Sequence, residues 1–142
     1  MEISKDLNEL CYKLVGVCME VHREIGPGFP EEYYQKALEV EFGGSSIEFE
    51  SQKPIPMFYK GTQIGMNYLD FLIEEKVILE IKSVRKLDEV HLWQVLKYLA
   101  VCPEYPVALV INFGHRSLES KRVLPTKKMQ DFRANAAPRQ AP

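Results

Sequence analysis

The stretch NYLDFLIEEKVILEIKSV, from Asn67 to Val84, decides the fold because two apolar runs flank a short charged segment. Such runs, broken by the turn-like sequence EEK, are typical of two antiparallel strands joined by a tight loop. Asp70, Glu80 and Lys82 interrupt these strands where a buried sheet would normally carry apolar side chains. The stretch therefore predicts a β-hairpin with polar residues built into it.

The register of this hairpin would bring the charged residues together. If residues 74–76 form a three-residue loop, Asp70 directly opposes Glu80. Strand alternation then puts Lys82 on the same face as Glu80, whereas a two-residue loop would shift the pairing. We expect the opposite face to carry the apolar side chains Leu69, Phe71, Val77, Leu79 and Ile81.

Two carboxylates at this separation repel each other unless a cation lies between them or one of them is protonated. Mg²⁺ is a natural partner, because it binds one or two carboxylates, keeps waters at its other positions and makes a bound water acidic. Lys82 would then hold or deprotonate the attacking water. The same residues would also suit cross-strand ion pairs on a half-exposed sheet, and this alternative stays open.

Length and composition favour a single globular domain. The chain has 142 residues, of which 46% are hydrophobic and 27% charged. We expect one domain over residues 1–130 and a disordered tail over 131–142. The polar start and the lack of a long apolar run predict a cytoplasmic protein without a signal peptide or membrane span. Three cysteines without a C-x-x-C pair argue against a disulfide framework, a zinc site and an iron–sulfur cluster.

Apolar spacing and turn residues predict the element order α-α-β-β-β-α-β-β. The first helix is expected from Asp6 to Ile25, with Asp6 and Glu9 as a capping box. Asp88 is expected to cap the third helix, and Pro30 suits the first turn of the second. The remaining elements are expected at 30–42 (helix), 46–73 and 76–84 (three or four strands), 87–101 (helix), 106–114 (a central strand) and 121–125 (a short strand).

Helical residues supply further candidates for the site. His91, Gln94 and Tyr98 fall on one polar and aromatic face of the third helix, where Gln94 would orient a water or a phosphate oxygen. His22 lies in the last turn of the first helix, and Glu31 begins the second. Gln94 and Tyr98 would also suit an ordinary helix surface, His22 a cap or the core, and Glu31 the helix dipole.

The charge distribution is uneven. Residues 1–50 hold eleven Asp or Glu against four Lys or Arg, whereas residues 51–142 hold nine against fourteen. The basic second half could lie along a polyanion, although a solvated surface would have the same composition. Its C-terminal part contains Arg116, Lys121, Arg122, Lys127, Lys128 and Arg133.

The sequence resembles a known family. GFPEEYY matches G-x-x-E-x-x-Y through Gly28, Glu31 and Tyr34, and EVHREIGPG, PIPMFYKG, LEIKSV, VHLWQVLKYL and LVINFG are similar to further blocks of the GxxExxY proteins. The resemblance covers about residues 5–125 in unbroken order. That family is assigned to the PD-(D/E)XK nuclease superfamily. It implies a restriction-endonuclease-like α/β core with a mixed central sheet flanked by helices.

The resemblance also implies roles for individual residues. Asp70 would be the motif aspartate and Glu80-x-Lys82 the E-x-K, although Leu69 replaces the proline that names the superfamily. The catalytic series would be similar to that of RecB-type exonucleases and would comprise His22, Glu31, Asp70, Glu80, Lys82, Gln94 and Tyr98. The implied ligands of Mg²⁺ or Mn²⁺ are Asp70, Glu80, the backbone carbonyl of Ile81 and, directly or through water, Glu31.

These observations lead to two functional hypotheses. The first is a metal-dependent, exonuclease-like enzyme that hydrolyses phosphodiesters in nucleic acid, with DNA as the expected substrate. The second is a catalytically inactive binding or assembly module with the same fold. A cysteine hydrolase using Cys102 has little support, because no glycine-rich elbow accompanies it. Strandedness, exo or endo cleavage, and a homodimer or an unidentified protein partner stay open.

Overall fold

The protein is described by a computed structural model that covers residues 3–126. Lys127, Lys128, Arg133 and the expected tail at 131–142 lie outside these residues. The elements are α1 (Lys5–Ile25), α2 (Glu31–Gly43), β1 (Phe49–Tyr59), β2 (Thr62–Ile73), β3 (Val77–Lys82), α3 (Glu89–Val101), β4 (Val107–Asn112) and β5 (Glu119–Val123). This order confirms the predicted one.

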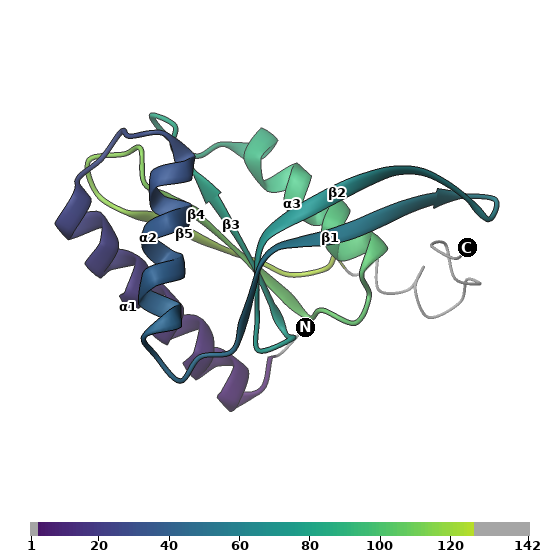
Figure 1. The fold of residues 1–142 in the computed structure, drawn as a ribbon, viewed down its shortest axis with the longest axis horizontal. Coiled ribbons are helices and arrows are strands. Elements are labelled where there is room, and N and C mark those ends of the chain that lie inside the picture. Colours follow the sequence, from purple (N-terminus) through teal and green to yellow (C-terminus); the bar gives the residue numbers. More distant parts are fainter. Residues whose placement is uncertain (1–2, 127–142) are drawn as a thin grey trace.

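The strands form one mixed sheet with helices on both faces. Its five strands run in the order β1-β2-β3-β4-β5, and only the β3–β4 pair, which α3 connects, is parallel. In Figure 1, α1 and α2 lie on one side of the sheet and α3 on the other. The predicted mixed sheet flanked by helices is therefore confirmed. The fully buried β4 lies inside the sheet, as expected, although β3 is its middle strand.

Alternation along the strands divides the core between the two faces. Phe71, Val77, Leu79 and Ile81 pack in the cluster that contains the buried residues of α1 and α2. The intervening Ile78 belongs to a second cluster, shared with α3. Because both faces are covered by helices, β3 is apolar on both sides except where Glu80 and Lys82 occur.

The structure corrects one expectation for the hairpin. Leu69 packs in the α3-side cluster and not beside Phe71. The pairing of β1 with β2 runs from Ser51–Phe71 to Lys53–Leu69, and Gln52 between them has φ 53°. This left-handed residue twists the ladder beside Asp70, so that simple alternation fails there.

The helix N-termini correct one predicted cap, that of α1, and confirm another, that of α3. The N-cap of α1 is Ser4, whose Oγ accepts a hydrogen bond from Leu7 N–H at 3.1 Å. The expected capping box at Asp6 was therefore wrong, because the helix begins one residue before it. Asp88 caps α3 as predicted, and His91 Nδ1 accepts a hydrogen bond from its backbone N–H at 3.0 Å. Pro30 is the N-cap of α2 and precedes its first turn.

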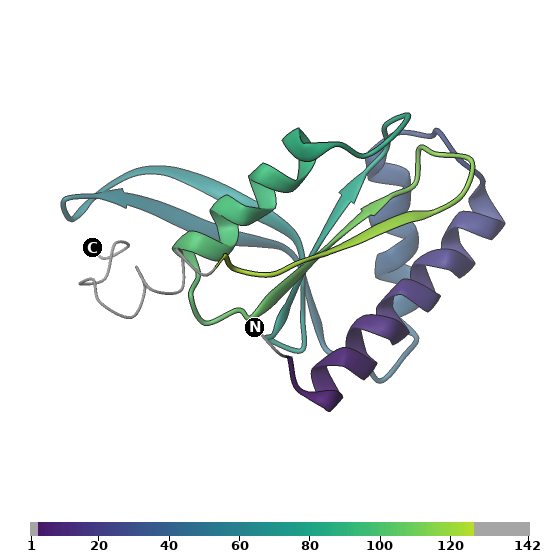
Figure 2. The same cartoon turned by 180° about the vertical axis from the view of Figure 1, so that it is seen from behind.

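Strands β1 and β2 continue beyond the body of the sheet. Figures 1 and 2 show this hairpin extending past α3 as a curved two-stranded arm. We call residues 51–69, including the connecting turn, the hairpin arm. Among the described helices, none combines the length and apolar character needed to cross a membrane.

The tight turn between β2 and β3 gives a test of the fold. Glu75 has φ 55°, a left-handed conformation that strains a residue with a Cβ atom. Glu75→Gly should raise the free energy of unfolding by about 1 kcal/mol, because glycine adopts this conformation without strain. Chemical denaturation would measure it. The same substitution at exposed Glu9, inside α1, should instead lower stability by about 1 kcal/mol. A loss of stability in both variants would contradict the left-handed turn.

Candidate active site

Strands β2 and β3 stop pairing where the hairpin reaches its two carboxylates. The pairs Ile73–Val77 and Phe71–Leu79 have the register expected for a three-residue loop, but the ladder ends there and does not extend to the predicted Asp70–Glu80 pair. Side chains then take over the hydrogen bonding. Ile81 N–H donates to Asp70 Oδ2 at 2.8 Å, and Asp70 N–H donates to Glu80 Oε1 at 3.2 Å. The structure therefore brings Asp70 and Glu80 together at the end of the paired strands.

Glu80 is an unusual residue for the interior of a sheet. Its side chain lies on the α3 side of β3 and is only 5% exposed. Burial, followed by the negative charge of Asp70 and the hydrogen bond between the two side chains, raises the pKa of Glu80 to about 9, although the Asp70 backbone N–H and the charge of Lys82 act in the opposite direction. In the absence of a cation, Glu80 therefore keeps its proton at neutral pH.

Lys82 is held by the face of α3 that the sequence singled out. Its Nζ donates to Gln94 Oε1 at 2.9 Å, and Gln94 Nε2 donates to Tyr98 Oη at 3.3 Å. Burial raises the pKa of Tyr98, and the charge of Glu80 adds to this increase. Lys82, Gln94 and Tyr98 thus form a chain beside Glu80, with the ammonium of Lys82 at its open end.

The N-terminus of α2 supplies the opposite wall. Glu31 is the first residue of α2 and lines a cleft of about 230 Å³ that also contains Asp70. Burial raises the pKa of Glu31, Lys82 lowers it and Asp70 raises it, which places all three groups within electrostatic reach. The remaining lining residues are Glu32, Gln35, Gln52 and Ile81.

The G-x-x-E-x-x-Y pattern has a direct structural explanation. Gly28 has φ 85°, which suits glycine, and it lies in the loop that leads into α2. Tyr34 Oη donates to the carbonyl of Gly26 at 2.6 Å and accepts a hydrogen bond from Phe29 N–H at 3.1 Å. The tyrosine therefore fixes the loop from inside, and the loop fixes where Glu31 starts the helix.

A buried amide secures the loop between β3 and α3. Asn112 Oδ1 accepts from the N–H groups of Val84 and Gly114 at 2.9 and 3.0 Å, and its Nδ2 donates to Val84 O and Glu119 Oε1 at 3.0 and 2.8 Å. Glu119 Oε1 also accepts from Leu87 N–H at 3.0 Å. A Cβ atom on Gly114 would lie 2.3 Å from Val84 O, so only glycine permits this approach. This Asn112 clamp sets where α3 begins.

Two residues near the carboxylates, Gln35 and Gln52, had no place in the sequence-based prediction, and His91 was placed there only as part of a helix face. Gln35 donates to the backbone carbonyl of Asp70 at 3.0 Å, and Gln52 donates to Asp70 Oδ1 at 3.4 Å. His91 lies close enough to Glu31 to lower its pKa. Only Gln35 carried a usable signal, because it lies four residues after Glu31 and hence on the same helix face.

His22 lies in a different environment from the other candidates. Its Nε2 is 3.0 Å from the carbonyl oxygen of His115, and its ring lies 6.2 Å from that of Phe113, centroid to centroid. These contacts attach the end of α1 to the loop after β4. A catalytic part for His22 stays a prediction, while its contacts give it a role in positioning.

The donor set of the cleft fits a hard divalent cation that keeps several waters. Within residues 3–126, no three His, Cys, Asp or Glu side chains already form a ligand group for a metal ion. Mg²⁺ and Mn²⁺ need only one or two carboxylates, and Asp70 and Glu80 provide them where a positive charge would relieve their repulsion. The chemistry therefore suits Mg²⁺ or Mn²⁺ and does not suit an all-protein cage.

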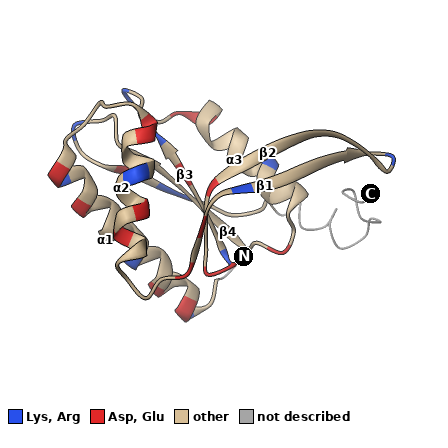
Figure 3. Ribbon diagram, viewed as in Figure 1, with Lys and Arg blue, Asp and Glu red and all other residues tan. Residues whose placement is uncertain are grey.

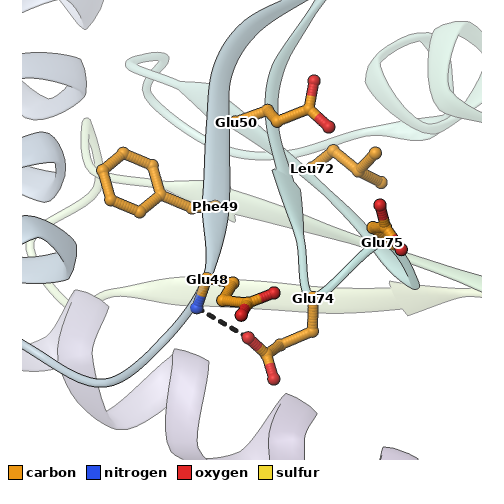
Figure 4. A pocket seen from close by; sticks show the side chains of 6 residues that line it. All are labelled: Glu48, Phe49, Glu50, Leu72, Glu74 and Glu75. Carbon is orange, nitrogen blue, oxygen red and sulfur yellow. Dashed lines mark hydrogen bonds between the residues drawn. The ribbon is translucent and has the colours of Figure 1, made fainter.

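A second hollow lies at the other end of the hairpin. Figure 4 shows it beside the β2–β3 turn, with four glutamates around it: Glu48, Glu50, Glu74 and Glu75. One of them has a structural role, because Glu74 Oε2 accepts a hydrogen bond from Glu48 N–H at 2.6 Å. Glutamate side chains without a facing lysine or arginine would repel a phosphate, so this hollow does not suit a polyanion.

Two described residues of the basic C-terminal part point to opposite faces of the sheet. Lys121 and Arg122 are on β5, the edge strand farthest from β1, and Arg122 Nη1 donates to Asn8 Oδ1 on α1 at 2.7 Å. The register places Lys121 in one row with Val110 and Glu80, whereas Arg122 is turned toward α1, so a contact of the basic second half with a polyanion stays a prediction. The ribbon in Figure 3 shows many of the acidic positions (red) on α1 and α2 and basic positions (blue) on the hairpin arm.

Comparison with known proteins gives one match. A family model described as the PD-(D/E)XK nuclease superfamily matches residues 8–123. No curated protein and no solved structure gives a match. The matched segment contains the whole mixed sheet, α2, α3, most of α1, and the Asp70 and Glu80-x-Lys82 positions at the end of the paired strands. From the extent of this match and the fold it shares, we conclude that the chain belongs to the PD-(D/E)XK nuclease superfamily.

Proposed function

We propose that the protein is a metal-dependent nuclease that hydrolyses phosphodiester bonds in nucleic acid, with DNA as its preferred substrate. The observation that supports this most directly is the pairing of Asp70, which lines the open cleft, with a buried Glu80 on whose pKa the charge of Lys82 acts. Such a pair is costly for folding alone, because the folded protein must neutralise one carboxyl by protonation. A role in binding a divalent cation would explain why the protein contains this destabilising pair.

The residues of the cleft have distinct proposed roles. Asp70, Glu80 and the backbone carbonyl of Ile81 would hold Mg²⁺ or Mn²⁺, with Glu31 joining directly or through water. When bound, the ion would polarise a phosphate oxygen and make a nearby water more acidic. Lys82 would hold that water and stabilise negative charge on the phosphate.

The α3 residues support the lysine. Gln94 accepts a hydrogen bond from Lys82 Nζ, and Tyr98 accepts one from Gln94. We infer that Gln94 orients the lysine in the resting protein and can turn toward water or phosphate when substrate binds. Tyr98 would limit this movement, so its role is positioning.

A binding or assembly module without turnover is the second candidate. The observation that favours it is that, among the described residues, no three acidic or metal-binding side chains already form a ligand group. Metal affinity and cleavage separate the two candidates, because a module would lack one or both.

Two finer assignments belong to the same proposal. We infer that the chain is a GxxExxY protein with one nuclease-like domain over residues 1–130, because Gly28 and Tyr34 shape the loop that places Glu31 at the cleft. We also propose a cytoplasmic location. It is supported by Cys11, Cys18 and Cys102, which are all free thiols buried in the structure.

Metal binding gives the first test of this site. Mn²⁺ or Mg²⁺ should raise the free energy of unfolding by about 1.4 to 2.7 kcal/mol when present at 10 to 100 times its Kd, because only the folded protein holds both carboxylates together. Thermal denaturation and titration calorimetry would measure this. Asp70→Asn should abolish the gain, whereas Glu24→Gln, on the exposed surface of α1, should retain it. The absence of any heat or thermal shift at millimolar metal would remove the basis of the catalytic proposal.

The protonated state of Glu80 gives a pH-dependent test. In metal-free protein its pKa is about 9, against about 4.3 in an unfolded chain, so the folded state holds a proton that unfolding releases. Its contribution to stability should therefore fall as the pH rises from 5 toward 9, by up to about 1.4 kcal/mol per pH unit. Chemical denaturation should show a flatter profile for Glu80→Gln, which has no proton to lose.

The exposed Glu32→Gln, in the same cleft, is the matched control for the pH series. Its profile should follow that of the wild type. Identical pH profiles for Glu80→Gln and the wild type would show that Glu80 is already ionised in the folded protein. With metal present, stability should instead increase as the pH rises. The metal displaces the proton of Glu80, so its binding becomes tighter at higher pH.

Cleavage tests the proposed function itself. Labelled DNA and RNA incubated with Mg²⁺ or Mn²⁺ should be cut, and Lys82→Ala should lower the rate by about 100-fold or more while it retains metal binding. Gln94→Ala should have a smaller effect, since Gln94 orients the lysine and the water but neither carries the positive charge nor holds the metal. Lys97→Ala, on the exposed side of α3, is the control and should remain active. Intact metal binding without cleavage of either nucleic acid would favour the module.

A further inference from the structure

The hairpin arm has a surface unlike the rest of the protein. Residues 51–69 contain no Asp or Glu and two lysines, Lys53 and Lys60, in a chain whose net charge is −2. Figure 3 shows the contrast with the acidic α1 and α2. The arm can therefore approach a polyanion without repulsion from its own side chains.

One face of the arm is apolar and open to solvent. The face turned toward α3 carries Ile55, which is 8% exposed and packs in the α3-side cluster. Because side chains alternate, Met66 and Tyr68 lie on the opposite face, and they are 42% and 53% exposed. At the tip, Tyr59 is also exposed and Lys60 Nζ lies 5.4 Å from the centre of its ring.

This open face continues into the candidate active site. Tyr68 precedes Asp70 by two residues on β2, and Gln52 on the neighbouring part of β1 lines the cleft. The cleft is bounded by Glu31 at the start of α2, and α2 packs on the same side of the sheet as the open face. A ligand that leaves the cleft along β2 would pass over Tyr68 and then Met66.

We propose that the hairpin arm binds an unpaired nucleic-acid strand, with Tyr68 stacking on a base next to the scissile phosphate and Met66 extending this contact. The inference rests on the proposed function and specifies its substrate as single-stranded. Aromatic side chains on an uncharged or basic surface suit exposed bases, because every base offers a flat face for stacking. Lys60 at the tip would contact the backbone of the strand, whereas Lys53 lies on the same face as Ile55 and is paired with Glu50 at 3.1 Å.

Two other occupants suit the arm less well. A further β-strand would need N–H donors along the edge strand β1, and Pro54 and Pro56 remove two of them. A DNA duplex is the stronger rival, because a two-stranded ribbon fits the major groove. Reading base edges there needs polar side chains, whereas Tyr68 and Met66 line the open face. Two lysines are also few beside the roughly 6–10 phosphate contacts of many duplex-binding proteins.

Binding should be measured by fluorescence anisotropy with the full chain in EDTA at low salt, where metal-dependent cutting cannot occur. The probes are a labelled single strand of about 12 nucleotides and a blunt duplex of the same length. The single strand should bind at least about 10-fold more tightly. Tyr68→Ala should weaken this binding about 5- to 100-fold, and Tyr68→Phe should restore it, because phenylalanine keeps the ring.

The matched control is Tyr12→Ala on α1, whose side chain is 82% exposed and remote from the arm. This variant should bind like the wild type. An oligonucleotide with abasic positions tests stacking itself. Removing these bases should weaken binding to the wild type, but it should change the affinity of Tyr68→Ala very little, because the stacking partner is already missing. If the losses of binding free energy from the substitution and from the missing bases simply add, Tyr68 does not stack on a base and the proposal is overturned.

The remaining outcomes separate this inference from the proposed function. If the protein cleaves nucleic acid but Tyr68→Ala keeps the single-strand affinity of the wild type, the proposed role of the arm is overturned and the proposed nuclease function is supported. Tighter binding of the duplex would also overturn it. Single-strand binding that depends on Tyr68, without metal-dependent cleavage, would support the arm and favour the binding module. Circular dichroism of Tyr68→Ala would confirm that the variant is folded.

Discussion

The place where β2 leaves β3 governs the rest of the structure. Two hydrogen bonds, from Ile81 N–H to Asp70 and from Asp70 N–H to Glu80, replace the backbone ladder at this point. They satisfy donors that the separating strands would otherwise leave unpaired in the interior. They also hold both carboxylates in fixed orientations, so the chemistry of the cleft depends on the same bonds that end the sheet. The long arm begins where this separation starts.

Such an arrangement conflicts with the requirements of a stable core. Glu80 is buried near another carboxylate, and its pKa rises to about 9 because the folded protein offers its charge too little solvation. Two of its neighbours along β3, Leu79 and Ile81, are apolar and buried. Local violations of this kind are expected at functional sites, where stability is exchanged for a preorganised charge arrangement. The cation that relieves the repulsion would then also stabilise the fold.

Features set by neighbouring residues could be predicted from the sequence, and features set by distant contacts could not. The element order, the Asp88 cap and the hairpin register follow from periodicity and turn length. Leu69 was misplaced because the left-handed Gln52 on another strand twists its surroundings. The order of the strands also places Gln52 at the cleft and Arg122 away from it. The order of strands in a sheet cannot be predicted from a local sequence pattern.

The Asn112 clamp joins two segments that are far apart in the sequence. One amide serves Val84 and Gly114 at once, and Gly114 approaches the Val84 backbone too closely for any side chain. An insertion or deletion in either segment would break the clamp unless the other changed with it. The two segments should therefore behave as one inherited unit. Among diverging descendants of this chain, length changes in the loop before α3 and in the turn after β4 would have to occur together, or not at all.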